Sequence, residues 1–383
     1  MKHIRCRQRV VVAALLVLSY AATMSAPAAA RTGAGASAAV QGTSLMSNLQ
    51  ADERVDFFTT SARLSADGKN WIVPIRGRVF RPISSVTRKA LIAQAMKSFG
   101  VDPDKDNRLR FDSRIDMLLS DNRGSRQLVI ELAGHAYPLP PSEADGHFFG
   151  SLPIPVADLA AYATTGRVAY TARLAERDAR TFGGMVLLVP PAGRSIISDI
   201  DDTVKITHVL STKRLLEATF MHQFQAVPGM ARLYQTWGAE GAVVHFVSST
   251  PWHFYEPLAV FLQEAGFPPA TLALKKIRLK DSSIQNIFAD ATKTKPPEIE
   301  AILKAYPERT FVMIGDSGEK DPEIYADFMR RYPKRIERIF IRNVSEGKRD
   351  DARFSNVFAG IEPDRWILFV DPDELPRVLR QPG

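Results

Sequence analysis

The sequence predicts a protein of the α/β class, in which a β-rich region precedes a parallel sheet with alternating helices. Its 383 residues are enough for two domains of ordinary size. A content of 45% hydrophobic and 24% charged residues is typical of a soluble globular protein. Short apolar runs separated by turns fill the first half, whereas strand and helix patterns alternate in the second half. This change indicates two regions that are built differently.

Residues 1–30 have the pattern of a secretory signal peptide. A basic stretch (MKHIRCRQRV) precedes an apolar run (VVAALLVLSYAA) and a stretch of small residues (APAAA). The apolar run is too short to favour a membrane span. We therefore expect an exported protein, periplasmic or secreted; a retained N-terminal anchor is the alternative. Residues 31–50 are small and polar and are expected to be a flexible lead-in.

Cleavage after residue 30 would change the charge and the thiol content. It would remove four basic residues and lower the net charge from +8 to +4. The remaining chain is mildly basic and has no long Lys/Arg run, so we expect no nucleic-acid partner. Cys6 is the single cysteine, and it would leave with the signal. Disulfides and cysteine-based hydrolysis are therefore excluded for the mature chain.

Residues 51–191 are expected to form a β-rich, sandwich-like accessory domain. The expected strands are NWIVPIRGRVFRP, RQLVIELAGHAYPL, HFFGSLPIP, GRVAYTARL and GGMVLLVPP. One helical segment, SSVTRKALIAQAMKSFG, follows a Ser/Thr cap signal. The sequence does not identify a protein partner for this domain.

Residues 192–383 are expected to form a parallel α/β domain after the hinge PPAGR. The expected strands are SIIS, AVVHFVS, TLAL, TFVMIG and RIFIRNV, with WILFV as an edge strand. The expected helices include MARLYQTWGAEG, FYEPLAVFLQEAG and PPEIEAILKAYP. Parallel sheets of this kind carry their sites at the carboxyl ends of the strands, and the polar clusters of this sequence fall there.

Three aspartates at these strand ends predict a cation site. In an extended stretch alternate residues share a face, so Asp199 and Asp201 are expected to project together while Ile200 points into the core. With Asp316 from a later strand they would form an all-oxygen site, which suits Mg²⁺. The cation would offset the repulsion between the carboxylates and would accept the oxygens of a phosphoryl group.

The residue types around this site predict phosphoryl chemistry. One carboxylate of the pair can attack phosphorus and form an aspartyl-phosphate. The other can protonate the departing alkoxide and later deprotonate the hydrolytic water. Ser248 and a lysine would bind the equatorial phosphoryl oxygens. Lys293 and Lys295 are the two candidates, and Lys295 is preferred because it directly precedes the predicted helix.

The four elements resemble the signature of the haloacid dehalogenase (HAD) superfamily of phosphatases. The matching segments are Asp199–Thr203, the strand that ends in Ser248, the lysine and GDSGEKD. The resemblance implies a HAD-like, Rossmann-like sheet with Asp199 as nucleophile and Asp201 as acid/base. It also implies that Thr203 orients the loop and that the metal is bound by Asp199, the backbone carbonyl of Asp201 and Asp316. Asp321 matches a second acidic position with a supporting role.

A narrower resemblance covers the chain from about Asp52 to the C-terminus. ISDIDDTVKIT, FVSSTPWHFY and FVMIGDSGEKDPEIY are similar to the catalytic domain of the actin-patch-protein type of phosphatidate phosphatase. DERVDFFTT and PPSEADGHFFG resemble the upstream domain of bacterial members. The resemblance implies a Mg²⁺-dependent phosphatase for phosphatidate or a related lipid phosphate. The alternatives are a phosphatase of soluble phosphomonoesters or phosphoproteins, and an inactive binding module.

The spacing of the motifs predicts a small cap or none over the site. Residues 204–227 and 251–294 separate the motifs, and neither stretch reaches the roughly 50 residues of a globular domain. An open site suits a bulky or membrane-embedded substrate. The first stretch mixes basic and apolar residues, so it is either a peripheral membrane contact or a core-packed helix with a solvated face.

Overall fold

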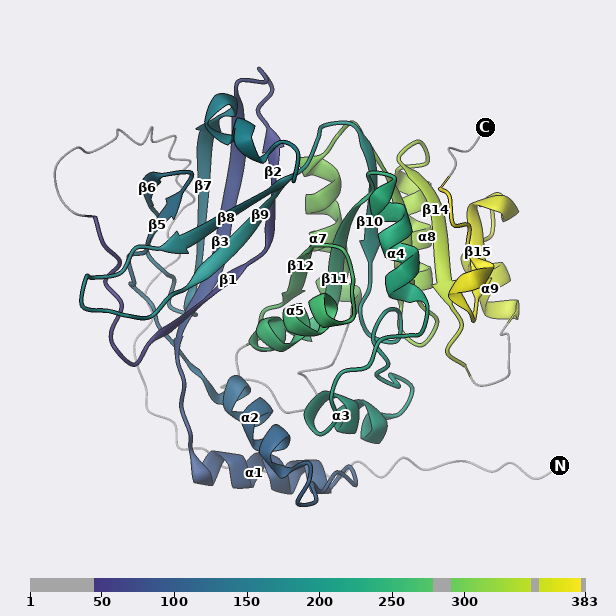
Figure 1. Ribbon diagram of the computed structural model, residues 1–383. Helices are drawn as coiled ribbons and strands as arrows, with labels where there is room; N and C mark the ends of the chain where they lie inside the picture. Colours follow the sequence, from purple (N-terminus) through teal and green to yellow (C-terminus); the bar gives the residue numbers. More distant parts are fainter. Residues whose placement is uncertain (1–44, 278–290, 346–350, 380–383) are drawn as a thin grey trace, which may run out of the picture. The chain divides into compact units, whose positions relative to one another are not determined.

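The computed structural model describes residues 45–277, 291–345 and 351–379. Within these ranges the strands form a nine-stranded sheet from the first half of the chain and a six-stranded sheet from the second half (Figure 1). The predicted mixture of a β-rich region and a parallel α/β sheet is therefore confirmed. The expected signal peptide lies outside the described residues. The expected domain boundary at 191/192 stays a prediction. The last strand of the first sheet ends at Leu188, and the first strand of the second sheet begins at Gly193.

The nine-stranded sheet is almost entirely antiparallel. Its strands are β1 (Arg54–Phe58), β2 (Thr60–Leu64), β3 (Asn70–Arg81), β4 (Asp121–Asn122), β5 (Val129–Leu132), β6 (His135–Pro138), β7 (His147–Pro155), β8 (Arg167–Ala172) and β9 (Gly183–Leu188). The path runs β1-β3-β2-β9-β8-β5-β6, and β4 and β7 also pair with β3. Because β2 pairs with both β3 and β9, the strands form one hydrogen-bonded network rather than two separate sheets. Their inward side chains share one apolar core.

One expected strand is a hairpin. RQLVIELAGHAYPL contains β5 and β6, which pair antiparallel around Ala133 and Gly134. Both turn residues have positive φ, 49° and 80°. The Gly supplies this left-handed backbone at little cost, so the chain reverses there instead of continuing as one strand.

Two helices between β3 and β5 pack away from the β-rich core. They are α1 (Val86–Lys97), capped by Ser85 as the sequence predicts, and α2 (Arg108–Leu119), which the sequence analysis missed. Buried side chains of both helices belong to the apolar cluster of the second sheet. Arg114 of α2 is buried, and its Nη1 donates to the carbonyl oxygen of His222, 2.8 Å away.

The second sheet is parallel throughout. Its strands are β10 (Gly193–Ser198), β11 (Val243–Pro251), β12 (Ala270–Lys275), β13 (Arg309–Asp316), β14 (Ile336–Arg342) and β15 (Trp366–Phe369). The order is β12-β11-β10-β13-β14-β15, so the predicted edge strand is at the edge. The register places Ile196 beside Val244 on one side and Val312 on the other. These apolar strands are buried on both faces, as parallel strands require.

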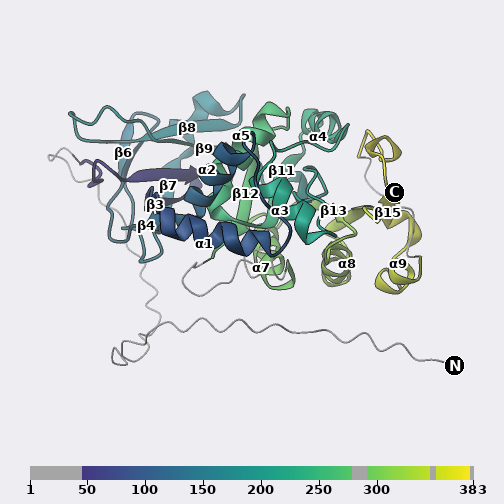
Figure 2. The same ribbon diagram turned by 90° about the horizontal axis from the view of Figure 1, so that it is seen from below.

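Helices cover both faces of this sheet. They are α3 (Thr212–Phe220), α4 (Met230–Ala239), α5 (Tyr255–Glu264), α7 (Ala291–Ala305), α8 (Asp321–Arg331) and α9 (Asp351–Val357). Figure 2 shows α4 and α5 on one side of the strands and α7, α8 and α9 on the other. Separate apolar clusters fill the two sides. Leu216 and Phe220 of α3 are buried. This part of the stretch 204–227 therefore packs in the core, which is one of the two interpretations that the sequence left open.

The strand order reverses at β10. Because β10 lies between β11 and β13, the carboxyl ends of these three strands meet at a topological switch point, where sheets of this class carry their sites. No helix in the described part of the chain is long and apolar enough to cross a bilayer.

Candidate active site

Asp199 is the centre of the polar cluster at the carboxyl end of β10. Its side chain is buried, and its backbone N–H donates to the carbonyl of Ile314 in β13 at 2.9 Å, which fixes it between the two strands. Oδ2 accepts a hydrogen bond from Thr203 Oγ1 at 3.1 Å. Oδ1 lies 2.8 Å from Lys295 Nζ. Two residues that the sequence assigned to the site, Thr203 and Lys295, thus contact Asp199 directly.

Lys295 is a fully buried cation surrounded by carboxylates. Besides Asp199, its Nζ lies 2.5 Å from Asp321 Oδ1 and 3.0 Å from Glu319 Oε2. Burial lowers the pKa of Lys295, but the three negative neighbours outweigh burial and raise that pKa well above its ordinary value. The lysine is therefore charged at any physiological pH. Lys293, the alternative candidate, is exposed.

The helix that carries Lys295 begins earlier than predicted. The sequence analysis placed the lysine just before a helix that starts at Pro296, whereas α7 begins at Ala291 and contains both Pro296 and Pro297. Proline has no backbone N–H for an i→i−4 hydrogen bond, so it usually lies in the first turn of a helix; α7 continues through both prolines without those two bonds. Lys295 therefore projects from within α7.

Three buried carboxylates lie close enough together to share a cation. Asp199, Asp316 and Asp321 each offer an oxygen, and these oxygens lie within 4.8 Å of one another. Burial and the neighbouring negative charges raise the pKa values of Asp199 and Asp316 well above the ordinary range. Asp316 Oδ1 accepts from the backbone N–H groups of Gly318 and Glu319, whereas its buried Oδ2 has no hydrogen-bond partner in the described part of the chain.

This donor set fits a hard divalent cation. It is made of oxygen only, it carries more negative charge than one lysine can balance, and it leaves a buried carboxylate oxygen without a partner. Mg²⁺ prefers such ligands and keeps several waters of its own. A cation here would lower the pKa values of the carboxylates and remove their mutual repulsion.

The Asp201 carboxylate is not a member of this group. Its Oδ1 is bound by Lys205 Nζ at 2.7 Å and Thr207 Oγ1 at 2.8 Å. Its Oδ2 accepts from Ser248 Oγ at 3.1 Å and Thr250 Oγ1 at 2.9 Å. Burial raises the pKa of Asp201, but the charge of Lys205 and these hydrogen bonds outweigh burial and lower that pKa to about 2.

Ile200 is buried in the apolar core, as the alternation argument expects. β10 ends at Ser198, and a turn in which Asp202 has φ 52° follows Asp201. The Asp201 carboxylate is held by residues of this turn and of β11. That the carboxylates of Asp199 and Asp201 share one cation stays a prediction.

Asp202 supports the turn that carries Asp201. Its carboxylate accepts from the backbone N–H groups of Thr207, His208 and Val209 at 2.7, 2.9 and 2.6 Å. Its carbonyl oxygen accepts from Arg342 Nη1 at 2.7 Å. Four contacts thus hold the loop that carries Asp201.

Four further residues belong to the site and were not assigned to it from the sequence. Lys205, Thr207 and Thr250 bind Asp201, and Glu319 contacts Lys295. The four-residue spacing of Asp201 and Lys205 predicts a side-chain pair only in a helix, and this segment is a turn, so the spacing gave no signal for this contact. Thr250 directly precedes Pro251, and nothing in its local pattern distinguishes a turn residue from a site residue.

Similarity to known proteins covers the segment that holds this site. Residues 194–343 match the family model of phosphatidate phosphatase APP1, catalytic domain. An uncharacterized protein of Schizosaccharomyces pombe is 36% identical over 155 residues, 40% of this chain and 25% of that protein. Phosphatidate phosphatase APP1 of Saccharomyces cerevisiae is 33% identical over 166 residues, 42% of this chain and 28% of that protein. The chain thus spans roughly a quarter of the length of these relatives.

Proposed function

We propose that this protein is a Mg²⁺-dependent phosphatidate phosphatase, which hydrolyses a lipid phosphomonoester through an aspartyl-phosphate on Asp199. The match of residues 194–343 to a phosphatidate phosphatase catalytic domain supports the reaction class. The observation that carries the proposal is the buried group of Asp199, Asp316 and Asp321 around Lys295. We further propose that the parallel sheet is of the HAD-like kind and that the protein is exported after loss of residues 1–30.

Asp199 is the proposed nucleophile because it alone combines three contacts. Thr203 orients one carboxylate oxygen, Lys295 lies beside the other, and the backbone ties the residue to β13. Mg²⁺, when bound by Asp199 and Asp316, would supply charge compensation for the carboxylates and for the phosphoryl oxygens. Lys295 and Ser248 are the proposed ligands of the equatorial oxygens, where charge develops in the transition state.

The proposed reaction has two steps, formation and hydrolysis of the aspartyl-phosphate. A carboxylate oxygen of Asp199 forms a bond to phosphorus while the bond to the alcohol oxygen breaks, and the departing alkoxide takes a proton from Asp201. Water then attacks the aspartyl-phosphate and gives its proton to Asp201, which frees inorganic phosphate and the Asp199 carboxylate. Despite burial, Lys205 lowers the pKa of Asp201 to about 2, so Asp201 must take up its proton as the ester binds, while Lys205 continues to orient the carboxylate.

The decisive experiment measures hydrolysis of two substrates by the purified protein. Phosphatidate in detergent mixed micelles and p-nitrophenyl phosphate are each offered with Mg²⁺ and with EDTA. We expect phosphatidate hydrolysis that needs Mg²⁺ and falls as detergent dilutes the lipid at the surface. Preference for the soluble ester without surface dilution would instead support a phosphatase of soluble phosphomonoesters.

The variant Asp199→Asn tests whether Asp199, rather than a neighbouring carboxylate, is the nucleophile. It keeps the size of the side chain and one acceptor oxygen but cannot form the acyl phosphate, so turnover of both substrates should be lost. Thermal melting should show that the variant is folded. Turnover by the folded variant at the wild-type rate would refute Asp199 as nucleophile.

A further inference from the structure

Helix α2 contacts the segment that holds the Asp201 carboxylate, although α2 comes from the first half of the chain. This segment, residues 204–227, contains Lys205, whose Nζ lies 2.7 Å from Asp201 Oδ1. Its end returns beside its start, where the N–H of Ile206 donates to the carbonyl of Gln225 at 2.8 Å. The two ends of the segment are therefore fixed to each other, and a contact near its end also bears on Lys205.

Two arginines of α2 bind the C-terminal end of α3, which lies within this segment. Arg114 Nη1 donates to the carbonyl of His222 at 2.8 Å and also to the carbonyl of Thr219. Arg110 Nη1 donates to the carbonyl of Met221 at 3.2 Å. Carbonyl oxygens at the end of a helix have no partner within the helix and carry the negative end of its dipole. The two guanidinium groups therefore stabilise this end of α3 and fix it to α2.

Arg114 is a buried cation. Burial, together with the charge of Arg110, lowers the pKa of Arg114 to about 10, so the guanidinium stays charged at neutral pH. In the part of the chain that the structure describes, its hydrogen-bond partners are backbone carbonyls and not a carboxylate. A buried charge is costly unless it is hydrogen-bonded. The contact between α2 and α3 is therefore one that neither side can lose without leaving a buried polar group unpaired.

The ring of Phe224 connects Arg114 to Lys205. The guanidinium carbon of Arg114 lies 4.1 Å from the ring centroid, and Lys205 Nζ lies 4.7 Å from the same centroid. A cation over an aromatic face is attracted by the ring. The contacts therefore run from Arg114 through Phe224 to Lys205, and from Lys205 to Asp201 Oδ1.

Helix α2 is also packed, through α3, against the segment that follows β11, the strand that binds Asp201 Oδ2. Phe111 of α2 and Phe220 of α3 have their ring centroids 6.4 Å apart, and those of Phe220 and Phe254 are 5.6 Å apart. All three rings are buried. The helices α2 and α3 and the segment after β11 therefore share one set of packed rings.

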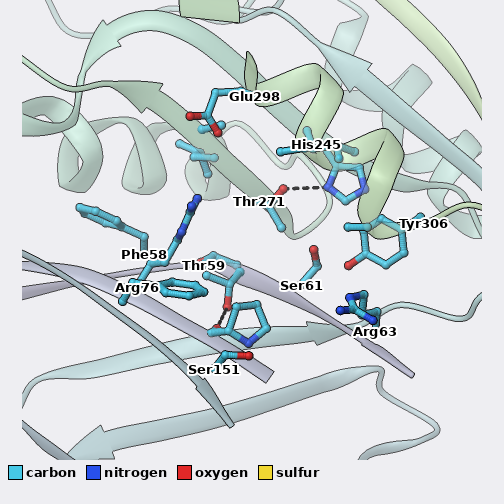
Figure 3. A pocket seen from close by; sticks show the side chains of 18 of the residues that line it. Phe58, Thr59, Ser61, Arg63, Arg76, Ser151, His245, Thr271, Glu298 and Tyr306 are labelled. Carbon is cyan, nitrogen blue, oxygen red and sulfur yellow. Dashed lines mark hydrogen bonds between the residues drawn. The ribbon is translucent and has the colours of Figure 1, made fainter. Parts of the chain in front are cut away.

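Strand β1 contacts the same segment after β11. Phe58 stacks on Trp252 with centroids 3.9 Å apart, and the backbone N–H of Thr59 donates to Tyr255 Oη at 2.7 Å. Figure 3 shows Phe58 and Thr59 in the wall of a cavity of about 280 Å³ between the nine-stranded sheet and β12. Because this cavity separates the two sheets, the contacts at its edge join β1 to the end of β11. Both oxygens of Asp201 are thus bound by segments that the first half of the chain contacts.

We propose that Arg114 is a positioning residue for Asp201, through which the first half of the chain holds the proposed acid/base in place. The inference rests on the proposed function, because only that reaction gives Asp201 an acid/base role. Arg114 acts through Phe224 and Lys205 and takes no part in the chemistry itself. A misplacement of about 1 Å caused by a mutation far from the chemistry can lower a rate about 10²-fold, so loss of this contact is measurable in turnover.

The kinetic test removes the guanidinium of Arg114 and measures two esters. Arg114→Met is compared with Arg108→Met, a matched control at the exposed start of α2, where Arg108 pairs with Asp112 at 3.1 Å. In Arg114→Met, kcat for phosphatidate should fall about 10²-fold. The kcat for p-nitrophenyl phosphate should fall less, because its leaving group needs little help from an acid. KM for both esters should stay near the wild-type value, since the proposed phosphate ligands are unchanged.

Two further variants distinguish positioning from general damage to the fold. Arg114→Lys keeps a cation and should restore part of the kcat for phosphatidate. Phe224→Leu keeps an apolar side chain but removes the ring that contacts both cations, so it should lower kcat for phosphatidate more than for p-nitrophenyl phosphate. An equal loss of kcat for both esters in Arg114→Met, or wild-type kinetics in both Arg114→Met and Phe224→Leu, would overturn the positioning role.

Hydrogen exchange keeps this inference separate from the proposed function. The backbone N–H groups of residues 204–227 are followed by mass spectrometry in the metal-free protein. They should exchange about tenfold faster in Arg114→Met than in Arg108→Met, the effect of losing one hydrogen bond to a charged group. Faster exchange without ester turnover by the wild type would overturn the phosphatase and leave Arg114 as the support of this segment. Equal exchange in the two variants, with turnover by the wild type, would overturn the role of Arg114 and leave the phosphatase in place.

Discussion

Lys205 Nζ lies 2.7 Å from Asp201 Oδ1, and this ion pair ties the proposed acid/base to its own loop. Lys205 is buried, and its Nζ also lies 4.7 Å from the centroid of the Phe224 ring. The pair therefore sits in a poorly solvated environment, where a charge contact is strong. It sets both the direction and the ionisation of the Asp201 carboxylate.

Replacing Lys205 by Met should impair turnover most for substrates with poor leaving groups. Without the lysine, Asp201 loses its orientation, and proton transfer by a positioned group is typically worth about 10²–10⁴-fold. An alkyl phosphate needs that proton more than p-nitrophenyl phosphate does. Steady-state kinetics on both esters should show a larger loss of kcat for the alkyl ester.

Lys213→Met is the matched control for this variant, because Lys213 is exposed and pairs with Glu217 at 3.7 Å in α3, away from Asp201. It should keep the wild-type ratio of the two activities. An equal loss of kcat for both esters in Lys205→Met would contradict the assigned positioning role.

Replacing Asp316 by Asn should stabilise the metal-free protein and abolish its response to Mg²⁺. Burial and the charges of Asp321 and Asp199 disfavour the ionised form of Asp316, so removing one negative charge relieves the cluster. Melting temperatures with EDTA should therefore rise in the variant. Added Mg²⁺ should raise the melting temperature of the wild type but not that of the variant; an equal rise in both would argue against this cluster as the cation site.

Acid should destabilise the protein partly through His245. Its folded-state pKa of about 3 lies below the unfolded value near 6.5, so the unfolded chain binds the proton first as pH falls. Stability from this group is complete above about pH 6.5 and is lost between pH 6.5 and 3; at pH 4.5 the loss is roughly 3 kcal/mol.

His245→Gln isolates this contribution, because glutamine keeps a polar group near Thr271 but does not titrate. Denaturant unfolding at pH 7 and pH 4.5 should show a smaller fall in unfolding free energy for the variant than for the wild type. An equal fall in unfolding free energy in the two proteins would show that His245 does not cause the loss of stability in acid.

The Phe58 ring should contribute strongly to stability. It is 2% exposed, stacks on Trp252 and joins the strand β1 to the segment that follows β11. Phe58→Ala should cost about 3–5 kcal/mol of unfolding free energy, because it leaves a cavity in a packed region. Leu109→Ala is the control: Leu109 is 84% exposed, and its truncation should change stability by no more than about 0.5 kcal/mol. Urea denaturation of both variants measures the difference.

The parallel sheet was predictable because its strands are continuous apolar runs between turn signals. Such runs specify burial on both faces whatever their neighbours are. The positions of Asp199 and Asp316 followed, since the carboxyl ends of parallel strands share one edge. The start of α7 and the helix α2 were not predictable in this way, because their helical state depends on buried contacts such as those of Lys295 and Arg114.

By itself the sequence determined which residue types stand at the strand ends, and hence that carboxylates, a hydroxyl and a lysine would meet at one edge of the sheet. Only the tertiary structure decided how they divide: Asp321 joins Asp199 and Asp316 around Lys295, while Asp201 turns to Lys205 and the hydroxyls of β11. The reason is geometric. A residue's place in a strand is encoded locally, but the direction of a side chain after the strand ends depends on partners from distant parts of the chain.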